Sequence, residues 1–371
     1  VPHLRFPEFS GEWDSFKLVE LGKFIGGGTP SSSNLSFWTG SIPWISSSDI
    51  KEDNINNISI SRYITEDAIE KSATKYCPAP VILIVSRVGV GKVALSHTSL
   101  CTSQDFCNII DIKCHPVFLS YNLLRTMKRK SREVQGTSIK GITSDELQKI
   151  RVFIPKNKDE QNKISNLLTL LDERIATQNK IIEDLKKLKS AISERLFNAI
   201  KGDVVVLEDI GDVVKGKQIN GEFLSESGKY YVMNGGIEPS GFYNDYNVEA
   251  NTISISEGGN SCGYVQFNAC PFWSGGHCYT IQNTTDNVKT EYLYQFLKSK
   301  ESEIMKLRIG SGLPNIQKKD LAKFKITIPN ISEQKVISAF LSSFERKADV
   351  EMNFVNLLLE EKQYLLRQMF I

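Results

Sequence analysis

The sequence has no long hydrophobic run, few histidines and no paired cysteine motif, and each absence excludes a class of protein. No apolar stretch approaches the roughly 18–20 residues that a helix needs to cross a bilayer, and the N-terminal residues lack the apolar core of a signal peptide. The four histidines have no spacing typical of a catalytic triad. The seven cysteines form an odd set without the spacing of a disulfide framework, so we expect a reducing, cytoplasmic location and no membrane partner.

The cysteines predict buried structural positions rather than a metal site. Cys107 and Cys278 fall at matching places in two apolar, strand-like runs, where a small buried residue fits well. The best zinc candidates lack the Cys-x-x-Cys pair of structural zinc sites. These candidates are Cys262, Cys270, His277 and Cys278.

Two short segments resemble catalytic motifs without completing them. Residues 87–93 contain the Gly-Lys pair of a phosphate-binding loop, but Ser86 replaces its first glycine and Val93 replaces the Mg²⁺-binding hydroxyl. Asp111 and Lys113 form an Asp-x-Lys fragment without a preceding Pro-Asp pair. The (Asn/Asp)-Pro-Pro-(Tyr/Phe) loop of amino-methyltransferases is missing. We therefore predict a hairpin turn at 87–93, no bound metal and no catalysis by this chain.

The sequence instead contains a long internal repeat. Segments 135–142 and 150–155 recur as 309–316 and 324–329 at an offset of 174 residues, and each repeat then enters a heptad-patterned helix. With 371 residues, 40% of them hydrophobic, the chain can build two cores. Both repeats are rich in β-type runs and contain a shorter helix, so we predict two similar α+β domains. The predicted boundaries are 1–158 and 203–331 for the domains and 159–202 and 332–371 for the long helices.

The two long helices predict an antiparallel coiled coil. Their apolar residues alternate in steps of four and three over nearly five heptads. Because only residues 201–203 connect the first helix to the second domain, the second helix should start at the far end of the first and return along it. This arrangement would have a pseudo-twofold axis across the helix pair.

Polar residues interrupt both apolar seams and suggest a register. Gln178 would face Lys362, and Lys189 would face Glu351, so that the buried charges find partners. A slip of one heptad would bury the lysines against apolar neighbours. The seam residues of this register are Leu171, Ile175, Gln178, Ile182, Leu185, Lys189, Ile192, Phe344, Glu351, Val355, Leu358, Lys362, Leu365 and Met369.

A basic helix followed by a polar, glycine-bearing loop predicts contacts with DNA phosphates. Residues 121–132 contain five cations and no acid. The net charge of the whole chain is only +2, but this does not exclude DNA binding, because the distribution of charge matters more than its sum. Cations, hydroxyls and backbone N–H groups together bind phosphates. The candidates are Lys128, Lys130, Arg132, Ser138 and Lys140 in the first repeat and Lys306, Arg308, Ser311 and Asn315 in the second.

Bases are read by polar side chains on projecting loops. Each loop candidate has a structural role as its alternative. The loop positions are Ser46, Ser47, Ser48, Arg87 and Lys92 in the first repeat and Lys217, Asn220, Asn234, Glu257 and Asn260 in the second.

Together these features resemble the specificity subunit of type I restriction–modification systems. Segments 2–13, 26–31, 42–44, 231–237 and 310–312 are similar to recurrent stretches of that family, and the resemblance covers the whole chain. It implies a non-catalytic chain whose two domains each bind half of a split, asymmetric DNA sequence, with helices that fix the spacer between the halves.

The resemblance also implies partners and cofactors. Two modification subunits would methylate adenine with S-adenosylmethionine, and restriction subunits would use ATP and Mg²⁺ to translocate and cleave DNA. The chain itself would bind double-stranded DNA and no cofactor, and its dissimilar middle portions predict unlike half-sites. Two alternatives stay open, namely a coiled-coil adaptor with two protein-binding domains and a stand-alone, metal-dependent nuclease.

Overall fold

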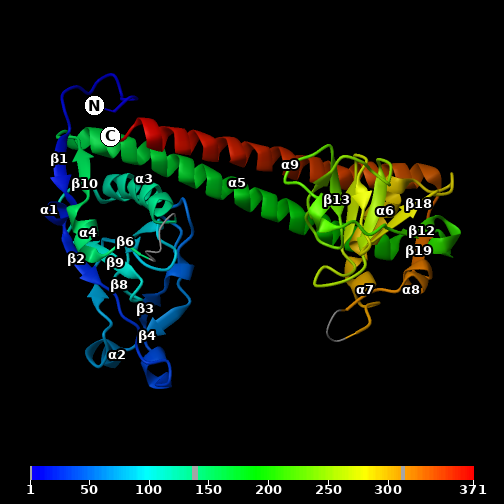
Figure 1. The fold of residues 1–371 in the computed structure, drawn as a ribbon, viewed down its shortest axis with the longest axis horizontal. Helices are drawn as coiled ribbons and strands as arrows, with labels where there is room; N and C mark the ends of the chain where they lie inside the picture. Colours follow the sequence, from blue (N-terminus) through cyan, green and yellow to red (C-terminus); the bar gives the residue numbers. More distant parts are fainter. Residues whose placement is uncertain (1, 136–140, 311–313) are drawn as a thin grey trace. The chain divides into compact units, whose positions relative to one another are not determined.

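In the computed structural model, the contacts of the chain divide it into two compact units, each joining a globular domain to one half of each long helix (Figure 1). Unit 1 comprises Val1–Gln178 and Phe354–Ile371, and unit 2 comprises Asn179–Asn353. This division cuts both long helices, so the domain boundaries drawn from the sequence stay a prediction. The structure describes residues 2–135, 141–310 and 314–371.

Unit 1 is built on three small sheets. Its strands are β1 (Asp14–Lys17), β2 (Lys23–Gly26), β3 (Ile42–Ile45), β4 (Arg62–Ile64), β5 (Tyr76–Cys77), β6 (Val81–Val85), β7 (Val93–Ser96), β8 (Leu100–Thr102), β9 (Phe106–Ile110) and β10 (Arg151–Ile154). Its helices before the coiled coil are α1 (Leu18–Leu21), η1 (Leu35–Trp38), η2 (Ser47–Asp49), α2 (Glu66–Glu70), α3 (Pro116–Gln135) and α4 (Ser144–Lys149). The strand orders are β2-β9-β6-β7, β4-β3-β8-β5 and β1-β10.

Strand β6 shows how the sequence builds the core of this unit. It is a continuous apolar run, which is typical of a strand covered on both faces. Ile82 and Ile84 join the core that α3 and the long helices cover, whereas Val81, Leu83 and Val85 join a second core. Since successive strand residues face opposite sides, one strand supplies both cores.

Unit 2 repeats this topology. Its strands are β11 (Asp203–Val206), β12 (Asp212–Lys215), β13 (Tyr230–Met233), β14 (Phe242–Tyr243), β15 (Thr252–Ser256), β16 (Val265–Asn268), β17 (Trp273–Ser274), β18 (Cys278–Gln282) and β19 (Lys325–Ile328). Its short helices are η3 (Leu207–Asp209), η4 (Gly221–Phe223), α6 (Thr290–Ser299), α7 (Glu301–Met305) and α8 (Lys318–Ala322). The order β12-β18-β15-β16 matches β2-β9-β6-β7, and the parallel pair β13–β17 matches β3–β8. The repeat predicted from the sequence is therefore a repeat of topology.

One helix of unit 2 differs from its prediction. The sequence predicts one shorter helix in each repeat, but in unit 2 this helix breaks at Lys300, which ends α6 and precedes α7. Lys300 has φ −100° and ψ 13°, outside the helical range, and its N–H still reaches the carbonyls of α6. The segment contains no glycine or proline that would have indicated this break.

The two long helices are α5 (Lys158–Ala199) and α9 (Ile331–Gln368). In unit 1 the beginning of α5 packs with the end of α9, since Leu168 and Leu365 share a core. In unit 2 the end of α5 packs with the beginning of α9, since Leu196 and Leu341 share a core. The helices are therefore antiparallel, as predicted.

The predicted register of the helices is wrong in unit 2. Lys189 Nζ lies 2.7 Å from Glu345 Oε1, whereas Glu351 pairs with Lys347 on its own helix. Glu345 follows the seam position Phe344, so the heptad pattern alone did not mark it as a partner.

The register is wrong in unit 1 for the same reason. Lys362 pairs with Asp172, which follows the seam position Leu171, and does not pair with Gln178. The amide oxygen of Gln178 is buried without a hydrogen-bond partner among the described residues. The observed register does not leave Lys362 among apolar groups, because Asp172 and the main-chain carbonyl of Asp53 bind its ammonium group. The hydroxyl of Tyr121, a domain residue, binds the other carboxylate oxygen of Asp172.

Five of the seven cysteines are buried as predicted, whereas Cys114 is partly buried and Cys270 is exposed. Cys107 and Cys278 are buried in β9 and β18, and burial raises the pKa of Cys278 to about 11. Over the described ranges, no three His, Cys, Asp or Glu side chains are grouped so that they could hold a metal ion. No helix in the described parts of the chain combines the length and apolar character that crossing a membrane requires.

Candidate nucleic-acid interface

In unit 1 the turn between β6 and β7 lies where several loops meet. The two strands pair antiparallel, so the segment between them is the predicted hairpin turn and not a phosphate loop. The carbonyl of Ser86 accepts the N–H of Ile142 at 2.7 Å, which holds the end of the glycine-bearing loop beside the turn. Lys92 Nζ donates to the carbonyl of Ser47 at 3.2 Å, and Arg87 is exposed nearby. The structure thus brings together three of the predicted positions.

The serine-rich turn beside this hairpin is held by a residue that sequence reasoning missed. Arg62 Nη2 donates to Ser46 Oγ at 2.7 Å and pairs with Asp49, and the guanidinium lies 4.6 Å from the centre of the Trp44 ring. Ser48 is exposed. Because the Arg62 side chain remains 39% exposed, it is an additional candidate for contact with DNA. A lone arginine in a short strand gave no pattern that could have identified it.

In unit 2 the turn between β15 and β16 lies beside the second glycine-bearing loop. The N–H of Ile316 donates to the carbonyl of Glu257 at 2.8 Å, and Gly258 forms a β-bridge with Asn315. Asn260 and Asn315 are both exposed. In each unit a hairpin turn is therefore bonded to the described residues at the end of the glycine-bearing loop.

The expectation that Glu257 projects from a loop is wrong. Its side chain is 9% exposed, and Oε1 accepts hydrogen bonds from Lys215 Nζ at 2.7 Å and from the Tyr279 hydroxyl at 3.0 Å. Burial, and secondly the bond to Glu257, raise the pKa of Tyr279. The polar residues after β15 resembled a loop, but the first of them still points inward. Lys215, with a side chain 52% exposed, is the candidate for DNA contact that this pair leaves accessible.

The other loop candidates of unit 2 differ in their surroundings. Asn234 has a structural contact, because its Oδ1 accepts the N–H of His277 at 3.1 Å. Lys217 is exposed, and its carbonyl accepts a hydrogen bond from Trp273 Nε1 at 3.0 Å. Asn220 is exposed and caps η4.

Both hairpin turns press against the following helical segment through a glycine. Gly91 has φ +113°, and a Cβ there would lie 3.1 Å from Ser131 at the end of α3. Gly263 has φ +91°, and a Cβ there would lie 2.9 Å from the main chain of Met305 at the end of α7. The left-handed backbone and the close approach both require glycine, so the turns are fixed to the helix ends.

The basic face of α3 is partly occupied by the protein itself. Lys128 Nζ bonds both carboxylate oxygens of Asp53 at 2.7 and 2.8 Å, and Arg125 Nη1 donates to the main-chain oxygen of Ile371 at 2.7 Å. Among the other predicted cations, Lys130 is half-buried, and the remaining three are exposed, namely Arg132, Lys306 and Arg308. Three further candidates lie outside the described residues, namely Ser138, Lys140 and Ser311.

A groove of about 220 Å³ lies between α3 and the end of α9 in unit 1. Its charged lining consists of five cations and one acid, Asp53. Burial, and secondly repulsion from Arg129, lower the pKa of Arg125, as expected where cations crowd. The five cations are Arg125, Lys128, Arg129, Arg132 and Arg367.

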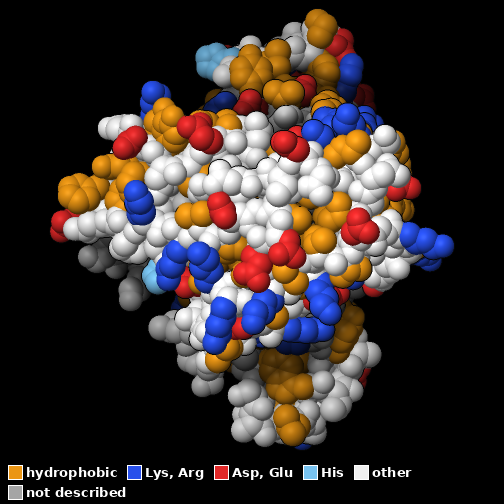
Figure 2. All heavy atoms as spheres, turned by 90° about the vertical axis from the view of Figure 1, so that its right-hand side faces the viewer, with side chains coloured by type: hydrophobic (Ala, Val, Ile, Leu, Met, Phe, Trp, Pro, Cys, Tyr) orange, Lys and Arg blue, Asp and Glu red, His pale blue; other side chains and the backbone are white. Residues whose placement is uncertain are grey.

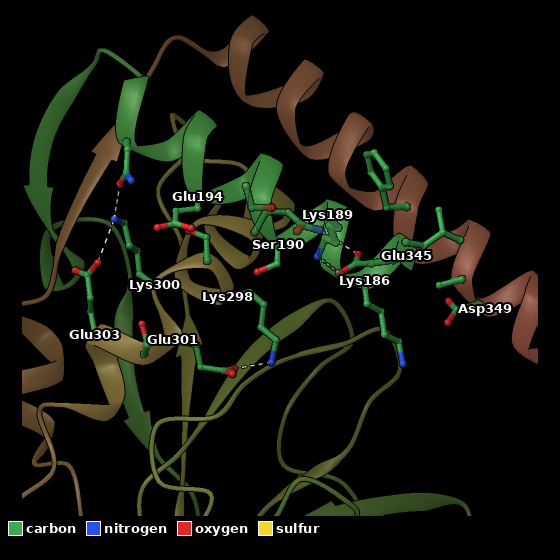
Figure 3. Close-up of a pocket in the computed structure, with 18 residues that line it drawn as sticks. Lys186, Lys189, Ser190, Glu194, Lys298, Lys300, Glu301, Glu303, Glu345 and Asp349 are labelled. Carbon is green, nitrogen blue, oxygen red and sulfur yellow. Dashed lines mark hydrogen bonds and ion pairs between the residues drawn. The ribbon is translucent and has the colours of Figure 1, made fainter. Parts of the chain in front are cut away.

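The equivalent groove of unit 2 is larger, about 650 Å³, and mixed in charge (Figure 3). Lys298 pairs with Glu301 at 2.5 Å and Lys300 with Glu303 at 3.1 Å, so acids offset the lysines. Figure 2 shows a similar mixture on one face of the molecule, where basic side chains gather in the lower part among acidic ones. The internal repeat matches each of the five cations of unit 1 with a residue 173 positions away in the other repeat. In the order Arg125, Lys128, Arg129, Arg132 and Arg367, the matching residues are Lys298, Glu301, Ser302, Met305 and Glu194.

A sequence model of the family described as "Type I restriction modification DNA specificity domain" matches residues 10–187 and again residues 201–358. The chain belongs to this family. Its role is accordingly DNA sequence recognition in a type I restriction–modification system, and DNA and the other subunits of such a system are its partners. The two matches of the specificity family follow the two repeats.

Relatives in the specificity family match the chain over most or half of its length. It is 28% identical over 365 residues to the type I restriction enzyme MjaIX specificity subunit of Methanocaldococcus jannaschii. The alignment covers 86% of this chain and 83% of that protein. It is 34% identical over 192 residues to the type I restriction enzyme EcoR124I/EcoR124II specificity subunit of Escherichia coli. This alignment covers 50% of this chain and 46% of that protein.

Solved structures from type I restriction–modification systems share the fold. The crystal structure of the type I restriction–modification S subunit from Mycoplasma genitalium superposes with a TM-score of 0.64 at 21% identity, covering 100% of this chain and 99% of that one. A chain from a study of type I complex assembly and conformational transition gives a TM-score of 0.62 at 16% identity, covering 98% of both chains. The predicted α+β architecture with long helices is confirmed.

Proposed function

We propose that this chain recognises a bipartite, asymmetric DNA sequence and directs adenine methylation and restriction by the partner subunits of its complex. Each unit would bind one half of the site, and the two long helices would fix the number of base pairs between the halves. The observation that carries this proposal is a hairpin turn bonded to the residues that end each glycine-bearing loop, Ile142 in unit 1 and Asn315 and Ile316 in unit 2. This arrangement occurs in each unit with unlike residues.

The unlike residues favour two different half-sites. The turn of unit 1 carries Arg87 and Lys92, and such side chains suit the acceptor atoms of guanine in the major groove. The turn and loop of unit 2 carry Asn260 and Asn315, and asparagine suits adenine. A palindromic site would require similar side chains in both units.

The partners in this proposal divide the chemistry. Two modification subunits would methylate adenine with S-adenosylmethionine, and restriction subunits would use ATP and Mg²⁺. This chain would take no catalytic part and bind no cofactor of its own. Two weak contacts joined by a stiff link reinforce each other through a high effective concentration, and the net charge of +2 leaves phosphate neutralisation partly to the partners.

The proposal is tested by DNA binding of the chain assembled with its modification subunits. Methylome sequencing of a host that carries the system would define the site, and duplexes with both halves, one half or neither would then be compared. Tight binding only when both halves are present supports the proposal. A palindromic methylation pattern, or equal binding to all three duplexes, contradicts it.

Two sets of variants test the parts separately. Replacing Lys128, Lys130 and Arg132 by alanine should weaken binding to every sequence and flatten its salt dependence. Adding one heptad to both α5 and α9 lengthens each helix by about 10 Å, so the preferred spacer should grow by about three base pairs. An unchanged salt slope would place the DNA elsewhere, and an unchanged spacer would refute the role of the helices.

A further inference from the structure

Unit 1 contains a buried Tyr–carboxylate–Lys cluster where its domain meets both long helices. Tyr121 of α3 donates its hydroxyl to Asp172 Oδ2 of α5 at 2.8 Å, and Lys362 of α9 pairs with the other carboxylate oxygen. Lys362 Nζ also donates to the carbonyl of Asp53 at 2.6 Å and lies 5.5 Å from the centre of the Tyr121 ring. The exposed fractions of the three residues are 0% for Tyr121, 3% for Asp172 and 1% for Lys362. One carboxylate therefore joins three helices inside the protein.

Unit 2 contains the same Tyr–carboxylate–Lys cluster in a more open form. Lys189 of α5 and Glu345 of α9 point toward each other (Figure 3), with Nζ 2.7 Å from Oε1. The hydroxyl of Tyr294 in α6 donates to the same oxygen at 3.2 Å, and Gln295 Nε2 donates to the other oxygen at 3.0 Å. Again one carboxylate joins a helix of the domain to both long helices.

The two clusters are equivalent under the internal repeat, with their lysines exchanged. Each unit takes its tyrosine and carboxylate from one repeat and its lysine from the other. The heptad pattern requires none of these residues, since an apolar side chain would suit each lysine position. The matching pairs, each 173 residues apart, are Tyr121 and Tyr294, Asp172 and Glu345, and Lys189 and Lys362.

We propose that the two Tyr–carboxylate–Lys clusters are positioning residues that fix the angle between each domain and the helix pair beneath it, and so set the spacer length that the chain accepts. This inference rests on the proposed bipartite recognition. A buried ion pair adds little net stability compared with apolar packing, but any other arrangement of its helices leaves a charge without a partner. The clusters therefore specify one geometry.

Spacer length is sensitive to this angle because DNA is helical. One additional base pair moves a half-site by about 3.4 Å and rotates it by about 34°. A domain whose angle is fixed cannot follow that rotation, whereas a domain free to pivot can follow part of it. Loss of a cluster should thus broaden spacer tolerance and leave recognition of each half-site intact.

The test measures the affinity of the complex with modification subunits for duplexes whose spacer is natural, one base pair shorter or one base pair longer. Tyr121→Phe and Tyr294→Phe remove only the hydroxyl link, and Asp172→Asn combined with Lys362→Met removes both charges of unit 1 together. We expect these variants to reduce the preference for the natural spacer about tenfold, or about 1.4 kcal/mol. Affinity for an isolated half-site should not change.

A matched control and the opposite outcomes make the result decisive. Asp67→Asn with Lys71→Met removes an exposed ion pair of unit 1 and should leave spacer preference unchanged. Folded variants with an unchanged preference overturn the inference, and if the charge-neutral pair does not fold, the two Tyr→Phe variants decide. A wild-type complex that ignores half-site sequence contradicts the proposed function itself, so the two failures are distinguishable.

Discussion

The two units place equivalent residues in their Tyr–carboxylate–Lys clusters but line the neighbouring groove with unlike charge. At four matching positions that line both grooves, unit 1 carries four positive charges, whereas unit 2 carries one positive and two negative charges. The same contrast holds at the hairpin turns, where Arg87 and Lys92 of unit 1 correspond to a turn with Asn260 in unit 2. Within one chain, the residues of the two clusters are alike, whereas those proposed to face DNA differ.

The clusters themselves differ in exposure, which decides how much each contributes. The side chains of Lys362 and Asp172 are 2% and 4% exposed, whereas those of Lys189 and Glu345 are 16% and 33% exposed. Water can therefore solvate a charge left alone in unit 2 but hardly in unit 1. Equivalent substitutions should thus have unequal effects.

The largest expected effect is that of breaking each ion pair. Lys362→Ala leaves Asp172 buried without a cation and should lower the free energy of unfolding of unit 1 by about 3–5 kcal/mol. Lys189→Ala should cost unit 2 only about 1 kcal/mol, because its pair is partly solvated. Denaturant titration followed by tryptophan fluorescence reports unit 1, which holds three of the four tryptophans, and hydrogen exchange reports unit 2. Equal losses in the two units would remove the distinction.

Substitutions in the hairpin turns should sharpen the contrast between half-sites. Arg87→Ala should relax the base preference of one half-site by about 1–3 kcal/mol and leave the other unchanged, and Asn260→Ala should do the reverse. Competition binding with duplexes randomised in one half at a time measures both preferences. If either substitution altered both halves, the units would not read DNA independently.

A smaller effect is expected from giving the groove of unit 1 the residues of unit 2. Arg129→Ser with Arg367→Glu should weaken DNA binding about tenfold and reduce the slope of log affinity against log salt by about 1–2, since fewer counterions are released. Fluorescence anisotropy over a salt series measures both. Lys71→Ser with Lys75→Glu changes the charge of unit 1 equally at exposed positions and serves as the control. The same slope change in both variants would mean that total charge, and not the groove, matters.

The smallest effect concerns the tyrosines. Tyr121→Phe and Tyr294→Phe should each cost about 1 kcal/mol of unfolding free energy at neutral pH through one lost hydrogen bond. Burial, and secondly the nearby carboxylate, raise the pKa of both phenols, so above about pH 10 the unfolded state loses protons that the folded state keeps. Stability should therefore fall as pH rises past that value, and less steeply in each Phe variant. Denaturation at pH 8 and at about pH 10.5 checks this, and an identical pH dependence in all forms would refute it.

Several elements that depend on local pattern could be predicted from the sequence. The heptad helices, the buried run of β6 and the hairpin at 87–93 all follow from periodicity and turn residues. The register of the helices did not, because periodicity identifies an apolar face but not how far one helix slides along another. In the observed register Lys362 binds Asp172, which also accepts a hydrogen bond from Tyr121 on a different element, and the heptad pattern gave no sign of this contact.

For the candidate site, the sequence predicted which segments lie close together but not which side chains are accessible. The repeat and the glycine-bearing loops identified the segments that meet, but not the direction of individual side chains. Glu257 lies in the correct segment and points inward to Lys215 and Tyr279. Arg62 was missed because its role depends on the Trp44 ring and the Asp49 carboxylate, which only the folded chain brings to it.

The exchanged lysines make each repeat incomplete alone. A fragment ending before β11 would keep Tyr121 and Asp172 and would lose Lys362, so its buried carboxylate would lack a cation. Lys189 of a second such fragment occupies the position that matches Lys362, so it would pair with Asp172 of the first fragment. Lys189 of the first fragment would pair with Asp172 of the second in the same way. Half-length chains of this kind should therefore associate in reciprocal pairs.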